Sequence, residues 1–124
     1  MTRVNLVSPD VLWDEHLIAE LREIPRIPNA VFSGKIKSQP PSEFKLGQGH
    51  VLFFTDKLVW LKKRYNELYL ESLKRGFNVI YRFPSVFGHI EWEPSGIDIQ
   101  LSCDRIAERK PKKPHYYGVK YDAI

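Results

Sequence analysis

Thr2 is the residue with the most distinctive potential chemistry in this sequence, because it directly follows Met1. Thr is small enough that we expect aminopeptidases to remove Met1 and expose the Thr2 α-amine. An α-amine has a pKa of about 7.7–8.0, against about 10.4 for lysine, so roughly a third of it is neutral at pH 7.5. A chain beginning at Thr2 would therefore carry a ready nucleophile, although Thr at this position is also commonplace in proteins without such chemistry.

His16 and Glu23 are side chains that could move protons beside such an amine. They lie two turns apart in a segment whose apolar residues recur at helical spacing, Trp13, Leu17, Leu21 and Ile24. The two polar side chains differ by only ~20° around this helix and lie to one side of the apolar stripe. A simpler interpretation is that His16 packs structurally and that Glu23 forms an exposed pair with Arg22 or Arg26.

The elements that must position these residues are helices. Ser8 as an N-cap and Pro9 after it predict that the first helix begins there, and Pro25 and Pro28 should disturb it near its end. The composition from Asn29 to Gln48 predicts a loop. In particular, "LGQGH" at residues 46 to 50 is expected to be a turn rather than a phosphate-binding loop.

Two further helices are expected after this loop. Apolar residues spaced three and four apart predict a second helix from Val51 to Lys74, ended by Gly76. Residues 77 to 94 are aromatic-rich without helical period and predict a long loop, with a short strand as the alternative. Ser95 with Asp98 resembles a capping box, and Ile97, Leu101 and Ile106 support a third helix to about Arg109. We therefore expect an all-α fold, one compact domain over residues 1–124 with three main helices and long connecting loops.

The net charge of +4 is concentrated near the carboxyl end. No acid interrupts residues 109 to 121, which hold five cations: Arg109, Lys110, Lys112, Lys113 and Lys120. His115, Tyr116, Tyr117 and Tyr121 are interleaved with them, a pattern that suits either a nucleic-acid surface or a solvated terminus.

Other common sites are not indicated by the sequence. Cys103 is the only cysteine, which excludes an internal disulfide or paired thiolates, and we expect it to be a small, partly buried side chain. Four scattered histidines give no metal spacing, and His50 and His89 are expected to be structural. No apolar run is long enough to cross a bilayer, so we expect a soluble, intracellular protein that binds neither a metal nor a cofactor.

Three stretches together resemble the phage endonuclease V family of pyrimidine dimer DNA glycosylases with AP lyase activity. These are "MTRVNL" at the start, "HLIAELREIPR" at 16 to 26 and "LGQGHVLFFTDKLVWLKKRYNELYLESLKRGFNV" at 46 to 79, with a weaker match through "RIAER" and "HYYG". The spacing of Thr2 and Glu23 within these motifs makes the resemblance specific.

The resemblance implies roles for particular residues. Thr2 would attack the sugar C1′ of the damaged nucleotide, displace the base and leave an imine, after which β-elimination cuts the strand. Glu23 would be the essential glutamate. DNA-binding residues would be Arg3, His16, Arg22, Arg26, Arg105, Lys112 and Lys113. The expected partner is double-stranded DNA with damaged bases, bound by a monomer in the cytoplasm or nucleoid, or in a host cell.

Several departures from the family pattern affect recognition rather than the imine chemistry. The connection from Ile27 to Leu46 is shorter, Leu101 replaces a basic DNA-contacting residue, and Lys112 and Lys113 stand where the family usually has aromatics. Two alternatives therefore stay open: an enzyme of the same fold that removes a different damaged or modified base, and a non-catalytic DNA-binding domain.

Overall fold

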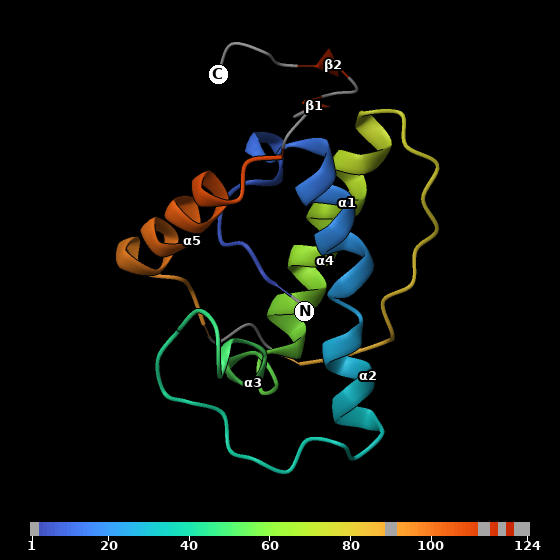
Figure 1. Ribbon diagram of the computed structural model, residues 1–124. Coiled ribbons are helices and arrows are strands. Elements are labelled where there is room, and N and C mark those ends of the chain that lie inside the picture. The colour runs from blue at the N-terminus through green and yellow to red at the C-terminus, as the bar shows by residue number, and fades with distance from the viewer. Residues whose placement is uncertain (1–2, 89–91, 112–114, 117–118, 121–124) are drawn as a thin grey trace.

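The described part of the chain is helical apart from two very short strands (Figure 1). A computed structural model describes residues 3–88, 92–111, 115–116 and 119–120. In chain order the elements are η1 (Pro9–Val11), α1 (Asp14–Glu23), α2 (Arg26–Phe32), α3 (His50–Phe53), α4 (Leu58–Lys74), α5 (Gly96–Glu108), β1 (His115–Tyr116) and β2 (Val119–Lys120). This confirms the all-α prediction. α1 and α2 correspond to the first expected helix, α3 and α4 to the second, and α5 to the third.

The first helix begins later than the sequence predicts. Ser8 and Pro9 start only the 3-10 turn η1, and the Ser8 side chain makes no capping hydrogen bond. Leu12 then has an extended backbone, with ψ of 142°, and a fully buried side chain. Because the chain breaks here to place Leu12 in the core, α1 begins at Asp14. The apolar stripe is buried as expected at Leu17, Leu21 and Ile24.

Pro25 and Pro28 divide the first helix from α2 without ending helical structure. Pro25 is the N-cap residue of α2, and Pro28 lies in its first turn. Proline loses no hydrogen bond there, because the first N–H groups of a helix have no partner within it. The prediction of a loop from Asn29 is therefore wrong by about one turn, since α2 continues to Phe32.

The second expected helix is interrupted by a turn at residues 54 to 56, which separates α3 from α4. The interruption buries both Phe53 and Phe54, whose rings pack edge to face with centroids 5.1 Å apart. The chain therefore changes direction directly after two aromatic residues that are both in the core.

α4 packs against α1 and forms the centre of the core. Its buried residues include Leu61, Tyr65 and Leu68, as the spacing predicts. The helix ends at Lys74, and Gly76 follows with φ of +88°, the left-handed conformation that glycine adopts most readily. The ending predicted from the sequence is confirmed.

α5 has the predicted capping box, but the apolar residues that indicated the helix do not form its most buried face. The Ser95 hydroxyl accepts a hydrogen bond from the Asp98 N–H at 3.2 Å, and the Asp98 carboxylate accepts one from the Ser95 N–H at 3.1 Å. Ile97 and Leu101 are exposed, and the buried residues are Ser102 and Arg105. Cys103 is exposed too, so the expectation of a partly buried thiol is wrong.

The connections have little regular structure, as expected. The "LGQGH" segment forms a turn in which Gly49 has φ of +89° and precedes α3. Residues 77 to 88 run along one side of the molecule without helix or strand (Figure 1). Near the carboxyl end, β1 and β2 pair in antiparallel register, and β1 contacts α1.

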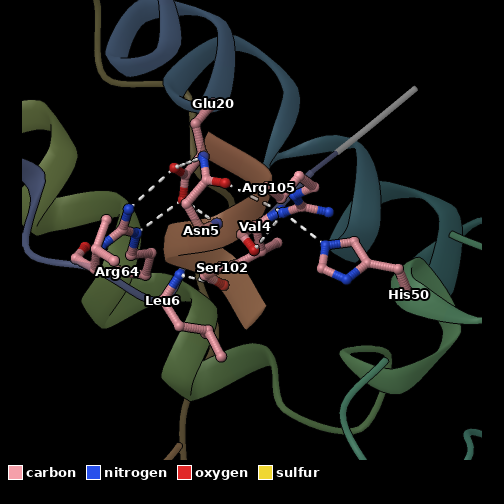
Figure 2. A network of polar contacts seen from close by, with 9 residues as sticks. Val4, Asn5, Leu6, Glu20, His50, Arg64, Ser102 and Arg105 are labelled. Carbon is pink, nitrogen blue, oxygen red and sulfur yellow. Dashed lines mark hydrogen bonds and ion pairs between the residues drawn. The ribbon is translucent and has the colours of Figure 1, made fainter. Parts of the chain in front are cut away.

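The amino-terminal segment, residues 4 to 7, crosses the interior between helices without forming a strand (Figure 2). Three consecutive backbone N–H groups donate to side chains of three different helices. The acceptors are His50 Nε2 at 2.9 Å for Val4, Glu20 Oε2 at 3.2 Å for Asn5, and Ser102 Oγ at 3.1 Å for Leu6. Because a buried backbone group without a partner is costly, these side chains determine where the segment can lie.

Glu20 and Arg64 form the centre of this network (Figure 2). The Glu20 carboxylate accepts from Arg64 Nε at 2.7 Å and Nη2 at 2.9 Å, and from Asn5 Nδ2 at 2.8 Å. Arg64 also donates to the Val7 carbonyl, and Arg105 donates at 3.1 Å to both the Val4 carbonyl and Asn5 Oδ1. We call the side chains that hold residues 4 to 7 the clamp, namely Glu20, His50, Arg64, Ser102 and Arg105.

His50 must be neutral to take part in the clamp. Its Nε2 accepts from the Val4 N–H, so the ring proton lies on Nδ1, which donates to the Lys45 carbonyl at 2.8 Å. Burial lowers the pKa of His50 to about 4, while the Lys45 carbonyl opposes the shift. The prediction that His50 is structural is confirmed.

We expect Glu20→Gln to destabilise the protein by about 3–5 kcal/mol, because it leaves the buried Arg64 guanidinium without its anionic partner. Urea unfolding would measure the loss. Glu15→Gln is the matched control, since Glu15 is exposed on the same helix and its replacement should change stability by less than about 0.5 kcal/mol. Equal stabilities of the two variants would contradict the central place of the Glu20–Arg64 pair.

Stability should also fall on mild acidification because of His50. Between pH 6.5 and about 4 the unfolded chain takes up a proton that the folded chain excludes, so lowering the pH favours unfolding. Above pH 6.5 the contribution of His50 is essentially complete, and about 2 kcal/mol of it should be lost between pH 7 and pH 5. His50→Gln, which cannot titrate, should be less stable than wild type at neutral pH. Its free energy of unfolding should, however, fall by about 2 kcal/mol less between pH 7 and pH 5. Parallel pH profiles of unfolding free energy for the two proteins would refute this.

Candidate active site

A small pocket of about 130 Å³ lies beside the amino-terminal segment, where α1 faces α5. Several of the residues that line it are charged, and two of these, Glu20 and Arg105, also belong to the clamp. The complete lining is Arg3, Asn5, His16, Ala19, Glu20, Glu23, Arg105, Ile106 and Arg109. We call this the α1–α5 pocket.

His16 and Glu23 reach the α1–α5 pocket from the same face of α1, as their spacing predicts. Glu23 is half-buried at the last residue of the helix, and His16 lies two turns earlier. Among the described residues no ion pair joins Glu23 to Arg22 or Arg26, so the simpler interpretation of Glu23 as an exposed paired side chain receives no support.

His16 is held at one ring nitrogen and open at the other. Its Nε2 lies 2.9 Å from the Arg109 carbonyl, and Trp13 packs edge to face with its ring. Nδ1 is buried and has no hydrogen-bond partner among the described residues. Burial lowers the pKa of His16, although the Arg109 carbonyl opposes this. A neutral ring that donates from Nε2 to a carbonyl leaves Nδ1 as a hydrogen-bond acceptor.

Three arginines line the α1–α5 pocket, where they outnumber its two carboxylates, Glu20 and Glu23. Burial lowers the pKa of Arg3, and nearby Arg109 lowers it further, while Glu23 acts in the opposite direction. Burial also lowers the pKa of Arg105 to about 10, with Arg3 and Arg109 adding to the shift. Guanidinium groups this close to one another favour the binding of an anion and disfavour a further cation.

Arg105 has a structural position that the sequence did not indicate. Its side chain is buried against the amino-terminal segment while also lining the pocket. Its predicted contact with DNA stays a prediction, whereas its hydrogen bonds to Val4 and Asn5 are part of the clamp.

The structure does not bring Arg22 and Arg26 into the α1–α5 pocket. Both are exposed and line a separate groove, next to residues 79 to 82, on another side of α1. Thr2, Lys112 and Lys113 lie outside the described residues, so their predicted roles stay predictions. His89, expected to be structural, lies outside them as well.

The sequence interpretation missed Asn5, Glu20, Arg64 and Ser102, which fix the amino-terminal segment. A signal for two of them was present. Glu20 lies directly beside the apolar stripe formed by Leu17, Leu21 and Ile24, and Arg64 lies directly beside the stripe of Leu61, Tyr65 and Leu68. A charge that is buried next to an apolar stripe requires a buried partner, and these two charges are each other's partner.

Two other features, a metal site and a membrane-spanning helix, do not occur among the described residues. No three His, Cys, Asp or Glu side chains in the described ranges cluster closely enough to hold a metal ion. In the same ranges, every helix is too short or too polar to span a membrane.

Comparison with known families agrees with the resemblance seen in the sequence. Residues 1–84 match the model of a family described as pyrimidine dimer DNA glycosylase. The matched region covers more than half of the chain and contains α1 to α4, including Glu23, Arg22 and Arg26, but it ends before α5. The chain therefore belongs to the pyrimidine dimer DNA glycosylase family, whose enzymes act on DNA in its repair.

Proposed function

We propose that this protein is a pyrimidine dimer DNA glycosylase with AP lyase activity, in which the Thr2 α-amine is the nucleophile and Glu23 the acid–base group. The family match supports glycosylase activity on DNA. The lyase step, the identity of the nucleophile and the preference for dimers are the parts that we infer.

The proposed reaction proceeds in two stages. The neutral Thr2 amine attacks C1′ of the damaged nucleotide, the bond from C1′ to the base breaks, and the base leaves with the bonding electrons. Loss of the amine proton and opening of the sugar ring give an imine. Removal of a C2′ proton, assisted by Glu23, then expels the 3′ phosphate and cuts the strand.

The observation that carries the proposal is that Arg3 lines the same pocket as Glu23 and His16. Thr2 is bonded to Arg3, and consecutive Cα atoms are about 3.8 Å apart. The clamp fixes the chain from Val4 onward, so the amine belongs to a residue only two positions from a fixed backbone. This arrangement supports Thr2 as the nucleophile over any lysine, whose pKa is ordinarily higher.

The charges around the α1–α5 pocket suit this chemistry. Arg3, Arg105 and Arg109 attract the phosphate groups that flank a damaged nucleotide and disfavour protonation of a nearby amine. Glu23 opposes the effect on the amine but can stabilise the positive charge that develops on the sugar. His16 Nδ1 is an acceptor that could hold the amine or a sugar hydroxyl.

The same proposal assigns the remaining contacts to DNA. Arg22 and Arg26 would hold the backbone outside the α1–α5 pocket, and Lys112 and Lys113 would extend the contact from the basic carboxyl-terminal region. We propose that residues 1–124 act as one domain and as a monomer, with neither a metal nor a cofactor required.

Borohydride reduction should trap the protein covalently on duplex DNA that contains a pyrimidine dimer or an abasic site, because the imine is reduced to a stable amine. The adduct should form with protein that begins at Thr2 and should be absent when that amine is acetylated or Met1 is retained. Mass spectrometry of the adduct would identify the bonded residue, and a lysine in that place would contradict the assignment of Thr2.

Glu23→Gln should reduce strand cleavage by about 10²–10⁴-fold while leaving DNA affinity close to normal, because it removes the proton acceptor and keeps the side-chain size. Glu15→Gln controls for loss of one negative charge on α1. Cleavage by Glu23→Gln at the unaltered rate would contradict the proposed acid–base role.

A panel of lesions would distinguish the open alternatives. Excision of dimers supports the proposal as stated, and excision of another modified base keeps the chemistry but changes the substrate. Salt-sensitive binding without any trapped adduct would indicate a non-catalytic DNA-binding protein.

A further inference from the structure

A second groove, of about 440 Å³, lies against α1 and α2 and is separate from the α1–α5 pocket. Its lining includes three arginines from three parts of the chain: Arg22 near the end of α1, Arg26 at the start of α2, and Arg82 in the irregular segment after α4. We call it the arginine groove. Arg82 has no role in the site described above.

Arg82 is placed in the arginine groove by α4. The Tyr65 hydroxyl accepts a hydrogen bond from the Arg82 N–H at 2.9 Å and lies 3.5 Å from the Ile80 carbonyl, to which it donates. Phe83, the next residue, is buried against the Tyr65 ring. Arg82 is therefore presented by a backbone held on both sides, although its own side chain is exposed.

The charges of the arginine groove are not balanced within it. Its described lining contains no carboxylate, and within the described part of the chain no ion pair involves Arg22, Arg26 or Arg82. Three like charges around one groove repel one another, and an anion that bridges them relieves that repulsion. Guanidinium groups are also the side chains best suited to bind phosphate through paired hydrogen bonds.

The position of the arginine groove favours a long polyanion over a small phosphate compound. Arg22 and Glu23 are adjacent residues of α1, but they line different hollows, so α1 is a wall shared by the groove and the pocket. A helix with its side chains is about 10–12 Å across. A ligand that occupies both hollows must therefore extend around α1, as a nucleic-acid backbone with its regularly repeated phosphates can.

We propose that Arg82 completes, with Arg22 and Arg26, a binding site for backbone phosphates of the substrate duplex on the side of α1 away from the α1–α5 pocket. The proposal rests on the proposed function, since it assumes that DNA is the bound polyanion. Arg82 is a positioning residue that does not touch the reacting atoms.

The test is the salt dependence of DNA binding by Arg82→Ala, measured on two duplexes, one undamaged and one with a stable abasic-site analogue. Loss of one phosphate contact should make the slope of log affinity against log salt shallower by about 0.9. Between 50 and 200 mM salt, the fold loss of DNA affinity should therefore be roughly threefold smaller for Arg82→Ala than for wild type. Both duplexes should be affected equally, because a phosphate contact carries no information about the base.

Matched variants separate charge from folding. Arg82→Lys keeps the cation and should retain most of the salt slope. If alanine disturbs the fold of the segment, Arg82→Gln provides a second neutral variant. Lys63→Ala removes an exposed cation of α4 that lines neither hollow and should leave the slope unchanged.

Inorganic phosphate added at constant ionic strength should not compete with DNA for the arginine groove. Selective competition by phosphate would indicate a site for a small phosphate compound and would overturn the proposal.

Borohydride trapping at saturating abasic DNA distinguishes this proposal from the proposed function. Arg82→Ala should still form the adduct, because the reacting groups are untouched, but it should need more abasic DNA for half-maximal yield, whereas Lys63→Ala should match wild type. An unchanged salt slope, or a loss confined to the damaged duplex, would overturn the role of Arg82. If wild type itself forms no adduct while the slope still changes, the catalytic proposal fails and the phosphate site stands.

Discussion

The buried pairing of Glu20 with Arg64 is the interaction on which the position of the amino terminus depends. Residues 4 to 7 run through the interior as an irregular segment, so their backbone groups cannot be satisfied by a neighbouring strand. Glu20 accepts hydrogen bonds from both the backbone and the side chain of Asn5, and Arg64 reaches the Val7 carbonyl. A charged pair in the core is costly to desolvate, but here each charge also satisfies polar groups of the segment.

The same network connects the fold to the α1–α5 pocket. His50 and Ser102 add contacts from α3 and α5 to those of Glu20 on α1 and Arg64 on α4, so side chains of four helices converge on one short piece of chain (Figure 2). Arg105 belongs to both the clamp and the wall of the pocket. Chemistry by a terminal amine requires a fixed chain end, because a freely moving terminus would lose the advantage of proximity. The clamp supplies that constraint for the residues that follow Thr2.

Much of the fold follows from local sequence signals, and what does not follow depends on tertiary contacts. The capping box at Ser95 and the glycine ending at Gly76 are local and were predicted correctly. The break at Leu12 and the turn after Phe53 were not, because core packing decided them. On α5, apolar Ile97 and Leu101 remain exposed while Ser102 and Arg105 are buried, since the amino-terminal segment needs a hydroxyl and a guanidinium there.

The candidate site was predicted in part for the same reason. The shared face of His16 and Glu23 is a property of one helix and could be derived from spacing alone. The separation of Arg22 and Arg26 from the α1–α5 pocket depends on the path of residues 79 to 82, which carry no periodic signal. Resemblance to a family supplied the role of Thr2, which composition and spacing leave open.

Amide hydrogen exchange at Val4, Asn5 and Leu6 is the most direct test of whether side chains of three helices hold the amino-terminal segment in place. If they do, these three N–H groups exchange slowly, with protection comparable to that of core amides in α4. Exchange at the rate of an unstructured chain, while α4 remains protected, would contradict the clamp and remove the basis for a fixed amine beside Glu23.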